Sequence, residues 1–300
     1  MNMEGDALGS EIAFYRLLKG LGKQAIIVNS DNVPTEYNFL PGVNEVRKFR
    51  NNLKDIKFDC FAILDCSGLR RCGEVSKMYR DNKTLLNIDH HVSNEGFGDI
   101  NWIDPDSSSC SEMVYKLYKK LCLPLDRDTA TLLYVGILTD TCSFHYPNTS
   151  SLTHRVASEL LKYNLDIAQI YKNVYENIPF KDMQLLIKIL PTMKRQFGGK
   201  IVWFQIKQDL LKRHKGVSFD LTEHVLNFAR AIKDVEVAVL FKENLGRVRV
   251  NLRSQGKINV NRIARFFGGG GHKTASGATV YGKIEDVVRM VLNKIKQSFK

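Results

Sequence analysis

Acidic and histidine side chains follow apolar runs at three points in the first half of the chain. Asp65 ends the run FAILD, Asp89-His90-His91 ends LLNIDHH, and Asp140 ends LLYVGILTD. A carboxylate in this position is costly unless a cation or hydrogen bonds compensate its charge. Helix N-terminal capping would explain any one of these acids about as well as a ligand role. The acid beside two histidines, together with two separate acids, favours a metal site.

The available donors indicate which metal would bind. Carboxylates with one or two imidazoles and no thiolate suit Mn²⁺ or Mg²⁺ better than zinc. The six cysteines form no C-x-x-C pair and show no zinc-site spacing. Acids that share a site must be neutralised, and two cations bridged by a carboxylate are the usual arrangement for phosphoester hydrolysis. The residues therefore predict a two-metal phosphoesterase, with two Mn²⁺ per chain expected and Mg²⁺ as the alternative.

Another pair of acids lies at the start of the chain. Glu4-Gly5-Asp6 forms a tight turn before a helix that we expect from Ala7 to about Leu21. Two acids one residue apart at a helix start suit a metal, although an ordinary acidic N-terminus is the alternative. Such a turn normally follows a strand, and here too few residues precede it to form one.

The first half alternates short apolar runs with helix-like segments, which predicts an α/β domain with a mainly parallel sheet. Ligands bind at the carboxyl ends of strands in such sheets, where Asp65 and Asp89 would lie. We expect strands over residues 24–30, 58–67 and 84–91, and a helix over Arg71–Arg80. A helical subdomain then follows, with helices over residues 108–122, 126–140 and 151–164.

The remaining residues predict a smaller C-terminal α/β domain. A connecting helix lies between Pro179 and Pro191. We expect strands over residues 201–206, 235–241, 247–254 and 276–281, and helices over 221–233, 259–267 and from about 283. The predicted domains are residues 1–178 and 200–300, with a linker over 179–199 and a cleft between the domains.

Two features of this second domain suit a phosphate group. The glycine run Gly268–Gly271, with Gly270 and Gly271 at its end, allows close backbone approach, and His272 follows it as a donor. Arg253 and Ser254, at the end of the expected strand 247–254, offer a guanidinium fork and a hydroxyl. A flexible glycine loop is the alternative interpretation.

These segments resemble a known family. NIDHH resembles the signature of the DHH phosphoesterases, a superfamily that includes RecJ-like exonucleases and family II pyrophosphatases. GDALGS is similar to the end of their first motif, FAILDCSGLRRCG to the second and GILTDTCSFHYPNTS to the fourth. GGGGHKTASG is similar to the glycine-rich motif of the associated DHHA1 domain. The order and length resemble the nano-RNase and phosphoadenosine-phosphate phosphatase branch.

The resemblance implies a role for each site residue. Asp65 would bridge both metals, and Asp6, His90 and Asp140 would bind the second. His91 would lie next to the scissile phosphate as a donor or a phosphate contact, and Asp89 would accompany it as a catalytic residue. The second domain would hold the substrate through the residues that it offers to phosphate, which are Arg253, Ser254, Gly270, Gly271 and His272. Arg71 matches an arginine after the second-motif acid, although a solvated helix charge is an equal alternative.

The first motif departs from the family pattern, which usually reads His-x-x-Pro-Asp-x-Asp after a strand. Asp6 matches the final acid, but Glu4 replaces the first Asp as a metal ligand and Met3 replaces the Pro. The histidine and the first strand would precede Met1. Three explanations are open: a true start farther upstream, a natural metal-poor variant, or a protein that binds ligands without catalysis. The missing strand favours the first, because its loss would cost stability as well as chemistry.

The composition indicates which kinds of partner the protein can bind. The net charge is +12, with much of the excess after residue 180, which favours anionic partners although solubility alone would also explain it. No run of about 18 apolar residues and no signal-peptide pattern occurs, so we expect no membrane segment. Cysteines inside apolar runs indicate reduced thiols and a cytoplasmic protein.

The resemblance implies a metal-dependent enzyme that hydrolyses short RNA oligonucleotides to mononucleotides and 3′-phosphoadenosine 5′-phosphate to AMP. Its expected partners are short RNA or nucleotide bisphosphates, with a homodimer as one oligomeric option. A cyclic-dinucleotide phosphodiesterase is an alternative enzyme, and a family II pyrophosphatase is a less favoured one. A non-catalytic nucleotide- or RNA-binding protein is the alternative from another class, because the first metal motif is incomplete.

Overall fold

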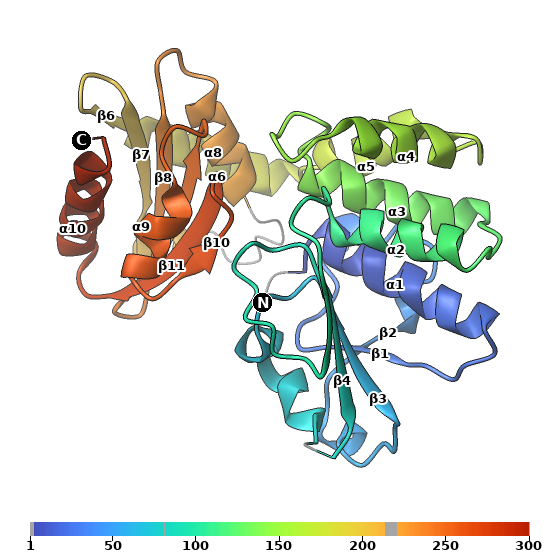
Figure 1. Ribbon diagram of the computed structural model, residues 1–300. Coiled ribbons are helices and arrows are strands. Elements are labelled where there is room, and N and C mark those ends of the chain that lie inside the picture. Colours follow the sequence, from blue (N-terminus) through green and yellow to red (C-terminus); the bar gives the residue numbers. More distant parts are fainter. Residues whose placement is uncertain (1–2, 81, 214–220, 300) are drawn as a thin grey trace. The chain divides into compact units, whose positions relative to one another are not determined.

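The computed structural model describes residues 3–80, 82–213 and 221–299 of the chain (Figure 1). It divides into two compact units, Met1–Asn177 and Ile178–Lys300, each with its own hydrophobic core. Both units combine helices with sheets, so the predicted two-domain α/β fold is confirmed. No helix in the described part of the chain has both the length and the apolar character that crossing a bilayer requires.

The first unit contains two parallel sheets. One has three strands in the order β3-β4-β5, and the other pairs β1 with β2. Their bounds are Ile27–Asn29 for β1, Val46–Lys48 for β2, Cys60–Leu64 for β3, Thr84–Asp89 for β4 and Ile100–Ile103 for β5. The three predicted strands are present but shorter than expected. The short strands β2 and β5 were not predicted, because neither has a long apolar run.

Helices α1 (Gly5–Gly20), α2 (Cys110–Lys120) and α3 (Arg127–Asp140) pack together and form the helical part of the first unit (Figure 1). Glycine brings α1 against α3: a Cβ at Gly9 would lie 2.4 Å from the carbonyl oxygen of Leu132, and one at Gly5 would lie 2.6 Å from the Thr139 side chain. This close packing fixes the first turn of α1 beside the last turn of α3. The unit ends with α4 (Ser151–Leu161) and α5 (Ile167–Tyr175).

The helix expected over Arg71–Arg80 is not an α-helix. Residues Leu69–Met78 form 3₁₀ turns that are interrupted at Gly73, whose φ of 63° and ψ of −138° are not helical. A residue in this conformation breaks the i to i+4 hydrogen-bond ladder, so a continuous α-helix cannot form across it. Three further 3₁₀ turns lie at Thr35–Tyr37, Val43–Glu45 and Asn51–Leu53.

The second unit is built on a six-stranded sheet in the order β10-β11-β9-β8-β7-β6, in which only β7 and β8 pair in parallel. The strands are β6 (Lys194–Gln196), β7 (Ile201–Ile206), β8 (Val237–Asn244), β9 (Arg247–Ser254), β10 (Gly270–Gly271) and β11 (Ala275–Tyr281). The helices are α6 (Phe180–Ile189), α7 (Gln208–Arg213), α8 (Thr222–Arg230), α9 (Val260–Phe266) and α10 (Ile284–Gln297), with a 3₁₀ turn at Leu190–Thr192.

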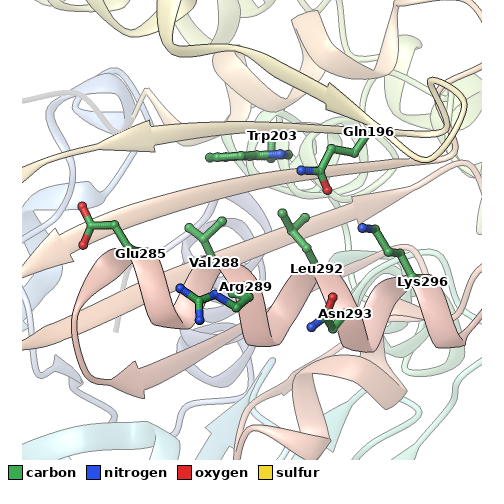
Figure 2. A pocket seen from close by; sticks show the side chains of 8 residues that line it. All are labelled: Gln196, Trp203, Glu285, Val288, Arg289, Leu292, Asn293 and Lys296. Carbon is green, nitrogen blue, oxygen red and sulfur yellow. The ribbon is translucent and has the colours of Figure 1, made fainter.

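Helices cover this sheet on both faces. On one face α9 and α10 pack on side chains that include Trp203, Phe241 and Val250. On the other face α6 and α8 pack on side chains that include Phe204 and Leu240. A pocket of about 220 Å³ lies on the α10 side of the sheet. Figure 2 shows that Val288 and Leu292 of α10 face Trp203 in this pocket. Alternation along β7 and β8 thus places one apolar layer on each face of the sheet.

Candidate metal centre and phosphate-binding elements

Four elements of the first unit bring the predicted ligands together. Asp65 directly follows β3, and His90 directly follows β4. The backbone N–H of Asp65 donates to the Ile88 carbonyl at 3.0 Å, which extends the pairing of these neighbouring parallel strands to their carboxyl ends. Asp6 lies in the first turn of α1, and Asp140 is the last residue of α3. The close packing of α1 on α3 therefore supplies the two remaining acids.

His90 lies at the centre of these acids and is only 3% exposed. Its Nε2 lies 3.5 Å from Asp65 Oδ1, 3.5 Å from Asp140 Oδ2 and 3.9 Å from Asp6 Oδ2. One imidazole nitrogen and three carboxylate oxygens thus converge on a small buried volume. This is the donor set that Mn²⁺ or Mg²⁺ accepts.

Asp65 provides a test of whether the site fits a cation. Its Oδ1 is buried and makes no hydrogen bond within the described part of the chain. Buried carboxylate oxygens normally have a partner, and a bound ion is one explanation for such an exception. The backbone of Asp65 also adopts a left-handed conformation, with φ 51°, which is uncommon outside glycine and often marks functional sites. Ligand atoms of Asp6, Asp65 and His90 lie within 4.8 Å of one another, so the residues present fit a divalent cation.

The pKa shifts of the clustered residues also support a metal site. Burial, reinforced by the charge of Asp65, raises the pKa of Asp6 from 3.8 to about 6, and burial raises the pKa of Asp140 to about 8. Burial alone would lower the pKa of His90, but the charges of Asp140, Asp65 and Asp6 outweigh it and raise that pKa well above 6.5. The metal-free cluster therefore retains protons near neutral pH, and a divalent cation would displace them.

The carboxylate of Asp6 is held by the backbone of α2. Its Oδ2 accepts a hydrogen bond from the Cys110 N–H at 2.7 Å, and its Oδ1 accepts one from the Ser111 N–H at 2.8 Å. These amides belong to the first turn of α2, where N–H groups lack partners within the helix. Gly136 of α3 packs directly against this arrangement. A Cβ at this position would lie 1.9 Å from Ser111 Oγ and 2.8 Å from Asp6 Oδ1.

A second group of polar side chains surrounds His91. Asp89 is fully buried, and its Oδ1 lies 2.7 Å from His91 Nδ1, while its Oδ2 accepts a hydrogen bond from Asn94 Nδ2 at 2.5 Å. Burial would raise the pKa of Asp89, but the hydrogen bonds and charge of His91 and the Asn94 bond lower it to about 2. An ionised Asp89 thus orients the His91 ring and fixes which nitrogen faces it.

Two supporting amides were missed from the sequence. Asn94 holds Asp89, and Asn148 Nδ2 lies 3.3 Å from Asp140 Oδ2 and donates to the carbonyl oxygens of Asp140, at 3.1 Å, and Ser108, at 2.8 Å. Asn148 lies within the segment that resembles the fourth motif, so its position was available as a signal. Asn94 follows the DHH residues by only a few positions, but nothing in its type marks it as a partner of Asp89.

Two predicted residues of the first unit, Glu4 and Arg71, are exposed. Glu4 is exposed at the N-cap of α1 without a side-chain capping bond, and it is not part of any group of potential ligands in the described residues. Arg71 is exposed, and its Nη1 donates to Ser67 Oγ at 2.8 Å. Their predicted roles, a metal ligand and a phosphate contact, stay predictions.

The last two residues of the glycine run in the second unit form a strand. Gly270 and Gly271 make up β10 and pair with Gly277 and Ser276 of β11. Glycine is required at position 271, because φ is +135° and a Cβ would lie 2.5 Å from the Ala275 carbonyl oxygen. His272 continues from β10, and its N–H donates to the Ala275 carbonyl at 2.7 Å. The run is therefore a tight hairpin that presents backbone, instead of a flexible loop.

Arg253 and Ser254 point to opposite sides of β9. The Arg253 guanidinium pairs with Glu223 of α8. Ser254 is 1% exposed, and its hydroxyl donates to the Ile258 carbonyl at 2.7 Å, so it stabilises the turn after β9. Adjacent strand residues face opposite ways, and this separates the two groups that the sequence analysis placed on one phosphate.

Comparison with known proteins agrees with this geometry. Residues 1–137 match the model of the DHH family, N-terminal domain, and residues 184–300 match that of the DHHA1 domain. The bifunctional oligoribonuclease and PAP phosphatase NrnA of Thermus thermophilus is 31% identical over 299 residues, covering 98% of this chain and 86% of that protein.

Two solved structures are also similar. An exopolyphosphatase-related protein from Bacteroides fragilis matches with a TM-score of 0.90 and 26% identity, covering 99% of this chain and 89% of that chain. RecJ from Thermus thermophilus, solved in complex with Mn²⁺, matches with a TM-score of 0.52 and 15% identity over 98% of this chain and 50% of that one, which concerns the fold alone. The sequence match and both domain models show that this chain is a hydrolase that belongs to the DHH and DHHA1 phosphoesterase family.

Proposed function

We propose that this protein hydrolyses short RNA oligonucleotides to mononucleotides and 3′-phosphoadenosine 5′-phosphate to AMP. The observation that carries the proposal is the convergence of three carboxylates on Nε2 of His90, beside a His91 that Asp89 orients. The name of the Thermus thermophilus relative, an oligoribonuclease and PAP phosphatase, supports this choice of substrates.

We assign the metal ligands from the geometry of the cluster. Asp6, Asp65, His90 and Asp140 would hold Mn²⁺ or Mg²⁺, and Asp65 would be shared between two ions. When bound, such ions lower the pKa of water and neutralise the charge on the phosphoester. Glu4 would complete the first ion's ligands from the N-cap of α1. The amides of Cys110 and Ser111 hold Asp6 in place for this role.

His91 would assist departure of the leaving group. Its Nδ1 faces Asp89 at 2.7 Å, so Nε2 is the nitrogen that can serve a substrate. Burial would lower the pKa of His91, but the hydrogen bond to Asp89 and the charges of Asp65 and Asp89 raise it, which favours the protonated ring. A protonated imidazole can donate to the leaving oxygen of a phosphoester. Asp89 acts here as a positioning residue.

The second unit would hold the substrate phosphate. Arg253 supplies a guanidinium, while Gly270 and Gly271 leave the backbone of β10 open to close approach by an anion. His272 would donate to the same phosphate. Arg71 of the first unit would contact another phosphate oxygen. Ser254 is the predicted contact that is hardest to include, because its hydroxyl already bonds to the Ile258 carbonyl.

The test is direct hydrolysis by the purified protein with added Mn²⁺. Labelled di- to pentaribonucleotides should release mononucleotides, and 3′-phosphoadenosine 5′-phosphate should release inorganic phosphate. Asp65→Asn should abolish both reactions, while the matched change Asp59→Asn, at an exposed acid before β3, should abolish neither. Release of neither product by a protein that binds about two Mn²⁺ would overturn the proposal.

The same assay separates the alternatives. A cyclic-dinucleotide phosphodiesterase would cleave cyclic dinucleotides faster than linear pentanucleotides. A non-catalytic binder would retain an oligonucleotide on a filter without cleaving it and would bind no Mn²⁺. The specific observation behind this second alternative is that Glu4 belongs to no group of potential metal ligands found among the described residues.

A further inference from the structure

One face of β9 and β11 carries polar side chains in place of an apolar layer. Along β9, Val248, Val250 and Leu252 are buried against α9 and α10. The residues between them face the other way, where Arg247 and Arg249 are exposed. β7 and the first half of β8, by contrast, are buried on both faces. The sheet thus has an open polar face that is confined to its β9–β11 side.

The strand register extends this face across neighbouring strands. Arg249 pairs with Lys242 of β8 on one side and with Thr279 of β11 on the other. In the next row, Arg247 pairs with Tyr281, which is 78% exposed. Because directly paired residues point to the same face of a sheet, these side chains form one surface. We name Arg247, Arg249, Asn251 and Arg253 of β9 the arginine row.

Arg249 lies against the glycine hairpin. A Cβ at Gly277 would be 3.1 Å from Arg249 Nη2 and 3.3 Å from its Cζ, so the guanidinium lies beside the bare backbone of β11. Gly277 is also the register partner of Gly270 in β10. The absence of side chains at both positions leaves space beside the guanidinium, which brings a planar cation and an accessible backbone together, as phosphate recognition requires.

Asn251 gives independent support for a ligand on this face of the sheet. It pairs with Gly277 on this face, and its Oδ1 is enclosed without a hydrogen-bond partner in the described part of the chain. Enclosed amide groups normally have a partner, and a ligand hydroxyl or amino group could supply one. Neither Arg249 nor Asn251 was predicted from the sequence, because the predicted phosphate contacts lay only at the end of this strand.

Charge identifies the kind of ligand. Residues 178–300 contain 24 Lys and Arg against 9 Asp and Glu, a net charge of +15, whereas the preceding residues contain 20 and 23, a net charge of −3. The whole positive excess therefore lies in the second unit. In the described part of the chain, Glu223 of α8 pairs with Arg253 at one end of the arginine row. Such a surface attracts polyanions.

We propose that the arginine row binds the phosphate groups of a single-stranded oligonucleotide beyond the nucleotide being cleaved. This deepens the proposed function and depends on it for the reaction. Alternate residues on a strand are about 6.8 Å apart, so Arg253 and Arg247 are separated by roughly 20 Å. A nucleotide bisphosphate is too short to cover this distance, whereas an oligonucleotide of several residues can. Tyr281 at the far end offers a ring on which a base can stack.

The test compares substrates of different length. Arg247→Ala and Arg249→Ala, singly and together, should raise the KM for a pentaribonucleotide about three- to tenfold for each lost charged contact. The ratio of kcat/KM for the pentanucleotide to kcat/KM for 3′-phosphoadenosine 5′-phosphate should fall at least about fivefold in the double variant. Each variant should also reduce the slope of log KM against log salt concentration by about 0.7, as expected for one phosphate contact on a single strand.

Arg289→Ala is the matched control, because Arg289 lies on α10, which covers the opposite face of the sheet (Figure 2), and its side chain is 74% exposed. This control should leave the substrate ratio and the salt slope unchanged. An unchanged ratio in the double variant, or an equal change in Arg289→Ala, would overturn the arginine row as a binding surface.

A binding measurement distinguishes failure of this inference from failure of the proposed function. Fluorescence anisotropy with a labelled pentaribonucleotide and EDTA needs no turnover. Weaker binding in Arg247→Ala and Arg249→Ala, but not in Arg289→Ala, supports the surface even if the wild type cleaves none of the substrates. Equal binding by all four proteins contradicts it even if the wild type is a nuclease.

Discussion

Nδ1 of His91 lies 2.7 Å from the fully buried Oδ1 of Asp89, at the carboxyl end of β4. This pair separates the roles of neighbouring histidines, because His90 points its Nε2 at three other carboxylates. Asp89 is thereby a partner of His91 instead of a member of the acid cluster around His90. Its contribution should appear in the behaviour of His91 more than in the binding of metal.

Asp89→Asn tests this distinction. The amide retains the size of the carboxylate but removes its charge, so the pKa of His91 should fall and the ring should be less firmly oriented. We expect kcat to decrease about 10- to 100-fold, as for other residues that orient a functional histidine. The high-pH limb of the kcat profile should move to lower pH. Unchanged Mn²⁺ affinity with this shifted limb supports the role, and a loss of Mn²⁺ with an unmoved limb contradicts it.

The metal-free protein should become less stable as pH rises. Asp6 and Asp140 have pKa values of about 6 and about 8 in the folded state, above the ordinary 3.8, so the folded protein binds more protons than the unfolded chain between these values. The free energy of unfolding therefore falls from about pH 4 to pH 8, and the raised pKa of His90 acts in the same direction above 6.5. The Tm of EDTA-treated protein should follow this decline, whereas Mn²⁺ should reverse it.

Asp140→Asn provides the matched variant for that experiment. Because this carboxylate is costly to ionise, its removal should raise the metal-free Tm at pH 8 by about 2–4 °C or more. A change of roughly 1 kcal/mol in the free energy of unfolding shifts the Tm by this amount in a unit of this size. The same change should weaken Mn²⁺ binding. Asp59→Asn, at an exposed acid, should do neither. A metal-free Tm that stays constant from pH 5 to pH 8 would contradict the linkage.

Gly136→Ala should damage the site through packing alone. Its Cβ would meet Ser111 Oγ at 1.9 Å and Asp6 Oδ1 at 2.8 Å, so Asp6 or α2 must move. We expect a loss of about 1–3 kcal/mol in the free energy of unfolding, measured by urea denaturation, and weaker Mn²⁺ binding by titration calorimetry. Gly20→Ala, where a Cβ meets nothing within 4 Å, should instead stabilise the protein by about 0.5–1 kcal/mol. Equal behaviour of the two variants would show that the contact around Asp6 is unimportant.

Alanine substitutions of the adjacent residues Arg253 and Ser254 should have different effects, one on KM and the other on stability. Arg253→Ala should raise KM for both substrates more than it lowers kcat, because the guanidinium lies on the open face of β9. Ser254→Ala should cost about 0.5–1.5 kcal/mol of stability, since it removes the bond to the Ile258 carbonyl, with little change in KM. A rise in KM for Ser254→Ala without a change in urea midpoint would restore its predicted role in substrate binding.

Much of the fold could be predicted because apolar runs determine which segments are buried. The strands Ile201–Ile206 and Arg247–Ser254 have the bounds that their residue patterns predict. The interrupted segment Leu69–Met78 could not be predicted, because the conformation of Gly73 is set by its surroundings. The two-residue strand Gly270–Gly271 has no side chains, so no hydrophobic pattern could reveal it.

Some residues of the candidate site could likewise be predicted from the sequence, and others could not. Asp65, His90 and Asp140 were found because a charged residue after an apolar run needs an explanation. Asn148 was not predicted although it lies in the segment that resembles the fourth motif, because a neutral amide that supports a ligand through hydrogen bonds does not call for a compensating partner as a charged residue does. Alternation along β9 would have separated Ser254 from Arg253 and drawn attention to Arg249. The two residues were predicted together because they are neighbours in sequence, although neighbours on a strand point to opposite faces.

The support of Asp6 by two backbone amides has a consequence for how this site tolerates mutation. Every residue except proline has an N–H, so almost any substitution at Cys110 or Ser111 that fits the available space leaves both hydrogen bonds to the carboxylate intact. These two hydrogen bonds are therefore inherited with helix α2 as a whole and do not require particular side chains at positions 110 and 111. Random substitution can readily replace Asp6 itself, but at positions 110 and 111 only proline, or a side chain too large for the space, would remove these two bonds.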